Sequence, residues 1–152
     1  ICVFTLAETD LIIDVNGYTP AGAGTQSVEP GRIYESRSGN PTYVTVDGQS
    51  EGDGRTPASG VAEIKVTDRA NVPTDAEAVF LNVVAVNPSG PGYLTVFPCG
   101  TTPPNAANVN YIGGDVAANA VLAKIGDGGK ICVFTLAETD LIIDVNGYVP
   151  GS

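Results

Sequence analysis

The sequence predicts an all-β protein built as an antiparallel β-sandwich. Short apolar runs, either alternating with polar residues or rich in β-branched residues, recur along the whole chain. Clusters of Gly, Pro, Asn and Asp separate these runs, as chain reversals require. The sequence shows no sustained helical period, and residues 116–122 are the one short stretch that could be helical. This pattern favours a sandwich over βαβ units, with a closed β-barrel or a β-trefoil-like fold as the alternatives.

The expected strands follow one another in chain order, with turn residues between them. Turns lie at 87–92, 113–115, 126–129 and 137–140, where Gly, Pro, Asn and Asp supply the backbone angles that reversals need. The strands are expected at Cys2–Leu6, Leu11–Val15, Arg32–Tyr34, Tyr43–Val46, Val61–Thr67, Ala78–Val86, Tyr93–Phe97, Asn108–Ile112, Ala120–Ile125, Cys132–Leu136 and Leu141–Val145.

The strand at 78–86 allows a more detailed prediction. Its odd positions are all apolar, whereas the even ones include Asn82, so one face of this strand should point inward. The strand at 93–97 follows across the turn at 87–92, and we expect the two to form the central hairpin of the core. Asp144 is either a solvent-facing residue of an alternating strand, which we favour, or a buried, hydrogen-bonded carboxylate. The predicted core comprises Val79, Leu81, Val83, Tyr93, Val96, Val121, Ile125, Ile142 and Val145.

One segment of the chain occurs twice. Residues Ile1–Tyr18 recur letter for letter as Ile131–Tyr148, which independent packing requirements would not produce. The spacing of the two copies fits one complete unit, since domains commonly run ~100–150 residues. We therefore interpret 1–18 as the terminal hairpin of a preceding repeat unit and 19–27 as a linker. Residues 28–148 would form one complete β-domain, and 149–152 would begin the next linker.

The repeat also explains an odd number of cysteines. Cys2 and Cys132 are the same position in successive units, so each unit carries one residue of that kind and one of the Cys99 kind. We expect a disulfide between Cys99 and Cys132, with Cys2 bonded in a neighbouring unit. The alternative is three unpaired, buried thiols, as in a protein kept in a reducing compartment.

Composition favours a secreted protein that acts without catalysis. The chain has 17 acidic and 7 basic residues, a balance that disfavours nucleic acid and anionic lipid as partners. No apolar run approaches the ~20 residues that span a bilayer, so we expect no membrane insertion. Because the sequence contains no histidine, the common Ser/His/Asp and Cys/His catalytic groups and histidine metal sites are excluded. We expect neither enzymatic activity nor an organic cofactor.

One acidic loop is a candidate metal site. Oxygen-bearing side chains alternate with other residues along 47–54, and glycines there would allow a tight wrap. Asp47, Glu51 and Asp53 could therefore bind Ca²⁺, which prefers several hard oxygen ligands. The position that would supply the closing bidentate ligand of an EF-hand is Ala58. The alternative interpretation is a solvated acidic turn.

Six segments of the chain carry a resemblance to a known family: Arg32–Gly39, Val72–Val79, Leu81–Pro88, Gly92–Gly100, Asn119–Gly126 and Leu141–Tyr148. Together they resemble a family of extracellular, often tandem-repeated β-domains of secreted bacterial surface proteins. The resemblance covers nearly all of residues 32–148, and the run at 92–100, ending in Pro-Cys-Gly, is its most specific part. The resemblance implies secretion, β-structure and a cysteine pair, and it implies no catalytic residues.

These observations predict a structural repeat unit of an extracellular fibre, sheath or surface stalk. Its partners would be other copies of the same unit, joined head to tail through the repeated segment. The alternative is an adhesion or carbohydrate-binding module displayed in several copies. The residues expected to make the assembly contact are Ile1, Val3, Phe4, Leu6, Leu11, Ile12, Ile13, Val15 and Tyr18.

Overall fold

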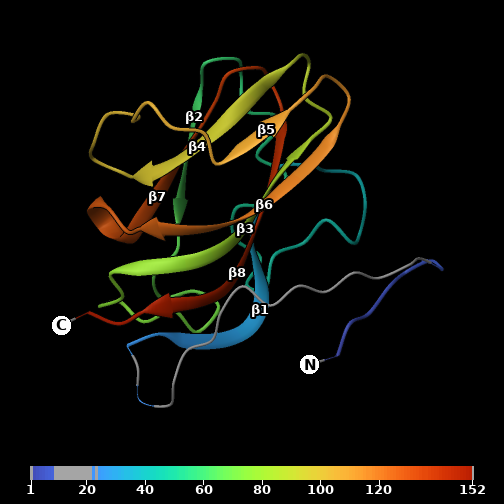
Figure 1. Cartoon of the computed structure of the whole chain (residues 1–152). Coiled ribbons are helices and arrows are strands. Elements are labelled where there is room, and N and C mark those ends of the chain that lie inside the picture. Colours follow the sequence, from blue (N-terminus) through green and yellow to red (C-terminus); the bar gives the residue numbers. More distant parts are fainter. Residues whose placement is uncertain (1, 9–21, 23, 152) are drawn as a thin grey trace.

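The fold is a two-layer antiparallel β-sandwich. The structure is a computed structural model, and it describes residues 2–8, 22 and 24–151. Two four-stranded sheets pack against each other and do not close into a barrel (Figure 1). The predicted fold class is therefore confirmed in its sandwich form, and the barrel and trefoil-like alternatives are set aside.

We call the two layers sheet one and sheet two. Sheet one has the order β1 (Gln26–Glu35), β8 (Asp140–Val149), β3 (Ala78–Val86) and β6 (Val116–Lys124). Sheet two has the order β2 (Val61–Lys65), β7 (Lys130–Thr135), β4 (Gly92–Pro98) and β5 (Val109–Tyr111). A single 3-10 turn, η1 (Asp127–Gly129), precedes β7. The stretch suspected of being helical, 116–122, lies within β6 and is a strand.

The chain changes sheet at almost every connection, which corrects two predictions. β3 belongs to sheet one and β4 to sheet two, so the central hairpin predicted from 78–86 and 93–97 is wrong. The segment 131–148 is likewise no hairpin, because β7 and β8 lie in different sheets. A turn sequence specifies a reversal of the chain but does not specify whether the next strand joins the same layer or the facing one. Among the strands described, only β4 and β5 are consecutive in the chain and paired with each other.

Most of the predicted core is found between the sheets. Val79, Leu81, Val83, Val96, Val121 and Val145 belong to the main buried cluster, and Ile125 packs at its edge. Tyr93 and Ile142 were assigned to the wrong face. Tyr93 lies on the outside of sheet two, where its ring centroid is 5.9 Å from that of Phe134. Ile142 is buried on the outer face of sheet one, opposite Val84.

The predicted disulfide between Cys99 and Cys132 is present and joins the residue after β4 to β7. The two cysteines form a small buried cluster with Phe97, against which Phe134 packs. Cys2 is exposed and is the free cysteine of the part of the chain that the structure describes. Its bond to a neighbouring unit stays a prediction.

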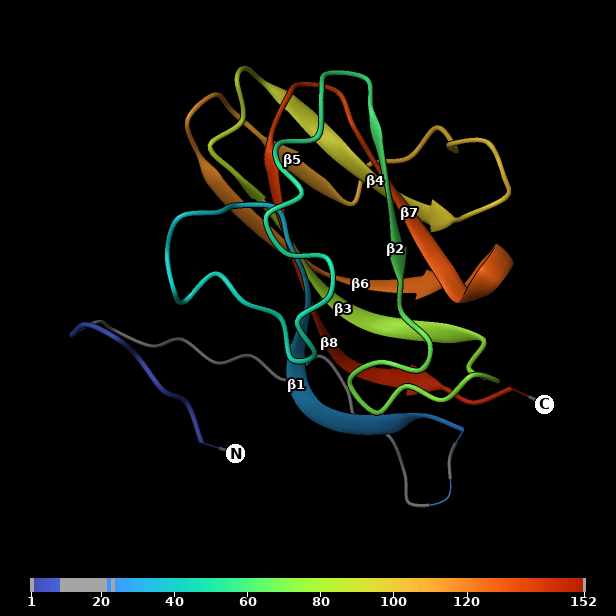
Figure 2. The ribbon, with the colours of Figure 1, turned by 180° about the vertical axis from the view of Figure 1, so that it is seen from behind.

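The start of β1 and the end of β8 lie side by side. Gln26 pairs with Tyr148 and Ser27 with Gly147, so the chain enters and leaves the sandwich at the same end (Figure 2). Gly147 is needed for this approach, because a Cβ there would stand 2.6 Å from the carbonyl oxygen of Gln26. Within the described residues, no helix has the length and apolar character to cross a bilayer.

Candidate assembly site

The segment 131–148 supplies one of the two inner strands of each sheet. β7 lies between β2 and β4 in sheet two, and β8 lies between β1 and β3 in sheet one. If this segment were removed, β1 and β2 would each lose the one neighbouring strand that they have among the described residues, and the core would open on both sides. We call the space that β7 and β8 occupy the slot. The unit therefore depends on the slot being filled, either by this segment or by an identical one.

The side chains of the segment explain why the fit is specific. Ile131, Val133, Leu141, Ile143 and Val145 point between the sheets and are almost completely buried. Burial of such large aliphatic side chains stabilises a fold by about 1.5–3 kcal/mol each. A one-residue slip would turn all of these side chains to the solvent faces, so the register is fixed by the pattern itself.

Two positions of the second copy contribute less than the sequence suggested. Leu136, the counterpart of Leu6, remains 42% exposed in its own unit, so this position adds little to the contact. Tyr148, the counterpart of Tyr18, is only partly buried at the edge of the core. Phe134, the counterpart of Phe4, packs against the disulfide cluster outside sheet two.

In the first copy, the described apolar side chains lie in solvent. Val3, Phe4 and Leu6 are 52%, 87% and 95% exposed, and residues 2–8 form no strand. The other predicted assembly residues, Ile1, Leu11, Ile12, Ile13, Val15 and Tyr18, lie outside the described residues. The assembly contact itself stays a prediction.

The structure does not gather the predicted calcium ligands into one site. Asp47 accepts two hydrogen bonds of 2.7 Å from the guanidinium of Arg69, whose side chain is only 2% exposed. Glu51 accepts a hydrogen bond from the backbone N–H of Thr45, and the hydroxyl of Thr45 lies within hydrogen-bond distance of both Asp47 and Glu51. The third predicted ligand, Asp53, is exposed. Across the described ranges, no three acidic or cysteine side chains come close enough to hold a metal ion.

The Arg69 contact sets the electrostatics of this loop. Hydrogen bonds from Arg69 are the main reason why the pKa of Asp47 falls to about 2. Arg69 also donates to the carbonyl oxygens of Lys65 and Gln49, so it anchors the loop to the end of β2. Sequence reasoning missed this role because Arg69 and Asp47 are distant in sequence and lie in different turns.

A second charged network covers the edge of sheet one. Glu35 is fully buried, and it accepts hydrogen bonds from the guanidinium groups of Arg32 and Arg37. Burial raises the pKa of Glu35, but the hydrogen bonds and charge of Arg37 outweigh it, and the net shift is downward. Arg37 also lies over the ring of Tyr43, 3.9 Å from its centroid. These contacts tie the loop after β1 to the sheet.

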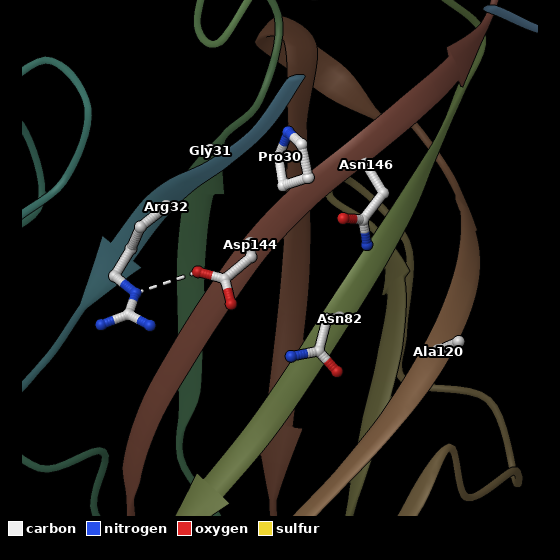
Figure 3. A pocket seen from close by; sticks show the side chains of 7 residues that line it. All are labelled: Pro30, Gly31, Arg32, Asn82, Ala120, Asp144 and Asn146. Atoms are coloured by element: carbon white, nitrogen blue, oxygen red, sulfur yellow. Dashed lines mark hydrogen bonds and ion pairs between the residues drawn. The ribbon is translucent and has the colours of Figure 1, made fainter. Parts of the chain in front are cut away.

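The same network reaches the outer face of sheet one through Arg32. Its Nε donates to Oδ1 of Asp144 at 2.9 Å. Asp144 thus lies on the outer face of the strand, as favoured from the sequence, but its side chain is ion-paired and only 23% exposed. It lies beside a hollow of about 430 Å³ that is also lined by Pro30, Gly31, Arg32, Asn82, Ala120 and Asn146 (Figure 3).

No protein-family model, curated protein or solved structure matches this chain.

Proposed function

We propose that this chain is a structural repeat unit of an extracellular array, in which successive units are joined through the segment that the sequence contains twice. The observation that carries the proposal is that 131–148 supplies one inner strand to each of the two sheets. A segment with that role cannot be a passive tail, so its exact duplicate at 1–18 is best explained as the end of another such sandwich.

Exposure of the first copy supports this proposal. Val3 and Phe4 are in water here, whereas their counterparts in the second copy, Val133 and Phe134, pack within the unit. An isolated pair of strands is marginal in water, so the first copy needs a slot to be stable. The disulfide supports an extracellular location, because such bonds persist mainly in oxidising compartments.

Units could be joined in two ways, and the fact that 131–148 already fills the slot favours one of them. In the first, residues 1–18 complete the preceding unit of one continuous polypeptide. In the second, the segment leaves its own unit and adds to the sheets of another chain, as in strand exchange. We favour the first, because 131–148 already fills the slot of the described unit and a donated segment would have to displace it.

An extended chain tests whether two units can follow each other in one polypeptide. Residues 26–130 placed before residue 1 add a second complete unit, because 26–130 followed by 1–18 has the same sequence as 26–148. We expect two sandwiches with the same melting temperature, about twice the unfolding enthalpy of one unit, and a disulfide between Cys2 and the added counterpart of Cys99. If one of the two units stays unfolded and Cys2 stays free, the linker at 19–25 does not allow two sandwiches to stand next to each other in one chain, and the array fails.

Truncated chains test whether the first copy fits the slot at all. Residues 22–129 lack both copies and should not fold, whereas 22–152 keeps the second copy and should. Residues 1–129 keep only the first copy, and they should also fold. The slot ends at the position of Tyr148, which pairs with Gln26, so the linker before Gln26 is long enough to place the first copy in the slot. A Cys2–Cys99 disulfide found by mass spectrometry would show that the first copy fills the slot. The molecular mass in solution would then distinguish a monomer, in which the copy fills the slot of its own chain, from a larger species, in which it fills the slot of another chain.

A further inference from the structure

The hollow on the outer face of sheet one has features of a ligand site that the array does not use. It is about 430 Å³ in volume, within the ~300–1,000 Å³ typical of small-molecule sites. Four of its residues form one row across all four strands: Arg32 pairs with Asp144, Asp144 with Asn82, and Asn82 with Ala120. Three inter-strand spacings make this row roughly 14 Å long.

Irregular backbone on both sides shapes the hollow. In β8, Val145 pairs with Leu81 and Gly147 with Phe80, so Asn146 is an extra residue with no partner on β3. In β1, the register shifts between Ser27 and Gly31, and Pro30 lies in this irregular stretch. Bulges of this kind commonly re-aim side chains beside functional sites. Here Asn146 lines the same hollow as Asp144 and Asn82 (Figure 3).

Several polar groups of the hollow face solvent and have no protein partner among the described residues. Asp144 uses Oδ1 for Arg32, and its Oδ2 has no hydrogen-bond partner among the described residues. The side-chain amides of Asn82 and Asn146 have no protein partner in the same part of the chain, although each can donate two hydrogen bonds and accept two. Ala120 leaves the far end of the row open. The hollow therefore offers donors and acceptors side by side.

The charges of the hollow select the class of ligand. Arg32 and Asp144 line the hollow and form an ion pair. Arg32 also pairs with Glu35, which pairs with Arg37, so the two positive and two negative charges of this network cancel. An anionic ligand would meet the free oxygen of Asp144, and a metal ion would find one free carboxylate beside a guanidinium. Four of the seven lining residues are polar or charged, which disfavours an apolar ligand. A neutral ligand whose hydroxyl groups both donate and accept matches this set.

We propose that the outer face of sheet one binds a neutral oligosaccharide along the row Arg32, Asp144, Asn82 and Ala120, with Asn146 contributing from the bulge. The amides of Asn82 and Asn146 and the free oxygen of Asp144 bond sugar hydroxyls, while Arg32 holds Asp144 in place. This site goes beyond the proposed array and does not need it. If units are repeated, the same shallow site is displayed many times, so weak single sites would give useful avidity.

The test is a titration of the isotope-labelled chain, 1–152, with neutral hexasaccharides: cellohexaose, hexa-N-acetylchitohexaose, mannohexaose and maltohexaose. The side-chain amide signals of Asn82 and Asn146 should shift with at least one of them, with a Kd on the order of 1 mM or tighter. Asn82→Ala and Asn146→Ala should each weaken binding roughly three- to tenfold, the range of one hydrogen bond exchanged with water. Asn110→Ala is the matched control, an exposed asparagine on β5 of the other sheet.

Three outcomes would overturn the proposal. In the first, none of the four hexasaccharides shifts the two amide signals at about 10 mM, well above the expected Kd. In the second, Asn110→Ala weakens binding as much as the two variants in the hollow. In the third, an anionic hexagalacturonate binds more tightly than every neutral sugar, which would show that Arg32 and not the amide row recognises the ligand. The array experiments above are unaffected by any of these results.

Discussion

Replacement of Asp47 by alanine separates a structural role of the acidic loop from a metal-binding one. In the structure, the carboxylate neutralises Arg69, whose side chain is 2% exposed. Removal of one partner of a buried ion pair commonly costs about 3–5 kcal/mol, because the other charge is left uncompensated. Asp47 is itself partly exposed, and Arg69 keeps its bonds to two carbonyl oxygens. We therefore expect Asp47→Ala to lower the free energy of unfolding by about 2–3 kcal/mol.

The pKa of Asp47 gives an independent measure of the same contact. It falls from 3.8 to about 2 in the folded protein, so the stabilisation is present above pH ~4 and is lost as the pH falls through ~2. The shift corresponds to about 1–2 kcal/mol after a discount for solvent screening. Glu35 also has a lowered pKa, so only the difference between the wild type and the variant isolates Asp47. That difference should shrink between pH 4 and pH 2.

Urea denaturation with and without a chelator is the appropriate assay. Asp53→Ala, in the same loop but exposed, is the matched control and should change stability by less than about 0.5 kcal/mol. If Arg69 anchors the loop, the midpoint of the wild type should not depend on Ca²⁺. The reasoning is refuted if Asp47→Ala is as stable as the control, or if Ca²⁺ raises the midpoint of the wild type and Asp47→Ala abolishes that rise.

Three further perturbations probe the packing. Leu81→Ala should cost about 2–5 kcal/mol in chemical denaturation because Leu81 is 1% exposed, whereas Leu122→Ala, on an exposed position of β6, should stay within about 0.5 kcal/mol. Replacement of Cys99 and Cys132 by alanine should cost about 2–4 kcal/mol, and a loss below 1 kcal/mol would show that the disulfide is dispensable. Gly147→Ala should lower the melting temperature through a cost of about 1–3 kcal/mol, because its Cβ would clash with the backbone of β1; an unchanged melt would contradict that close approach.

Local patterns predicted most of the strands and most of the buried faces. The strand expected at Tyr43–Val46 is wrong, because this stretch is irregular and ends in a turn, and the one expected at Cys2–Leu6 is not formed. The predicted linker at 19–27 is too long at its end, because β1 already begins at Gln26. The alternation around Leu81 identified the inward face of β3, and the repeat allowed Cys99 to be paired with Cys132 without any structural information. The face of Tyr93 was misassigned because β4 has buried residues at successive positions, so a simple alternation does not reveal which of them faces the core.

Layer assignment and distant contacts could not be predicted. The turn at 87–92 was correctly placed, but the side of the sandwich that the chain reaches next depends on which strands are its neighbours there. The pairing of Arg69 with Asp47 and that of Arg32 with Asp144 join residues from separate loops and strands. The hollow likewise needs a bulge at Asn146, and a bulge depends on the register between two strands that are far apart in sequence.

The side-by-side position of Gln26 and Tyr148 determines how such a unit would respond to tension. A pull on the two flanking linkers would draw the start of β1 away from the end of β8 and would load the ladder between them one hydrogen-bonded pair at a time. Strands pulled from opposite ends would instead share the load over all of their pairs. A row of these units would therefore yield at low force by peeling β1, while the disulfide would keep β4 attached to β7 in the second sheet. Such an array would behave as an extensible tether that opens and recloses, and not as a stiff rod.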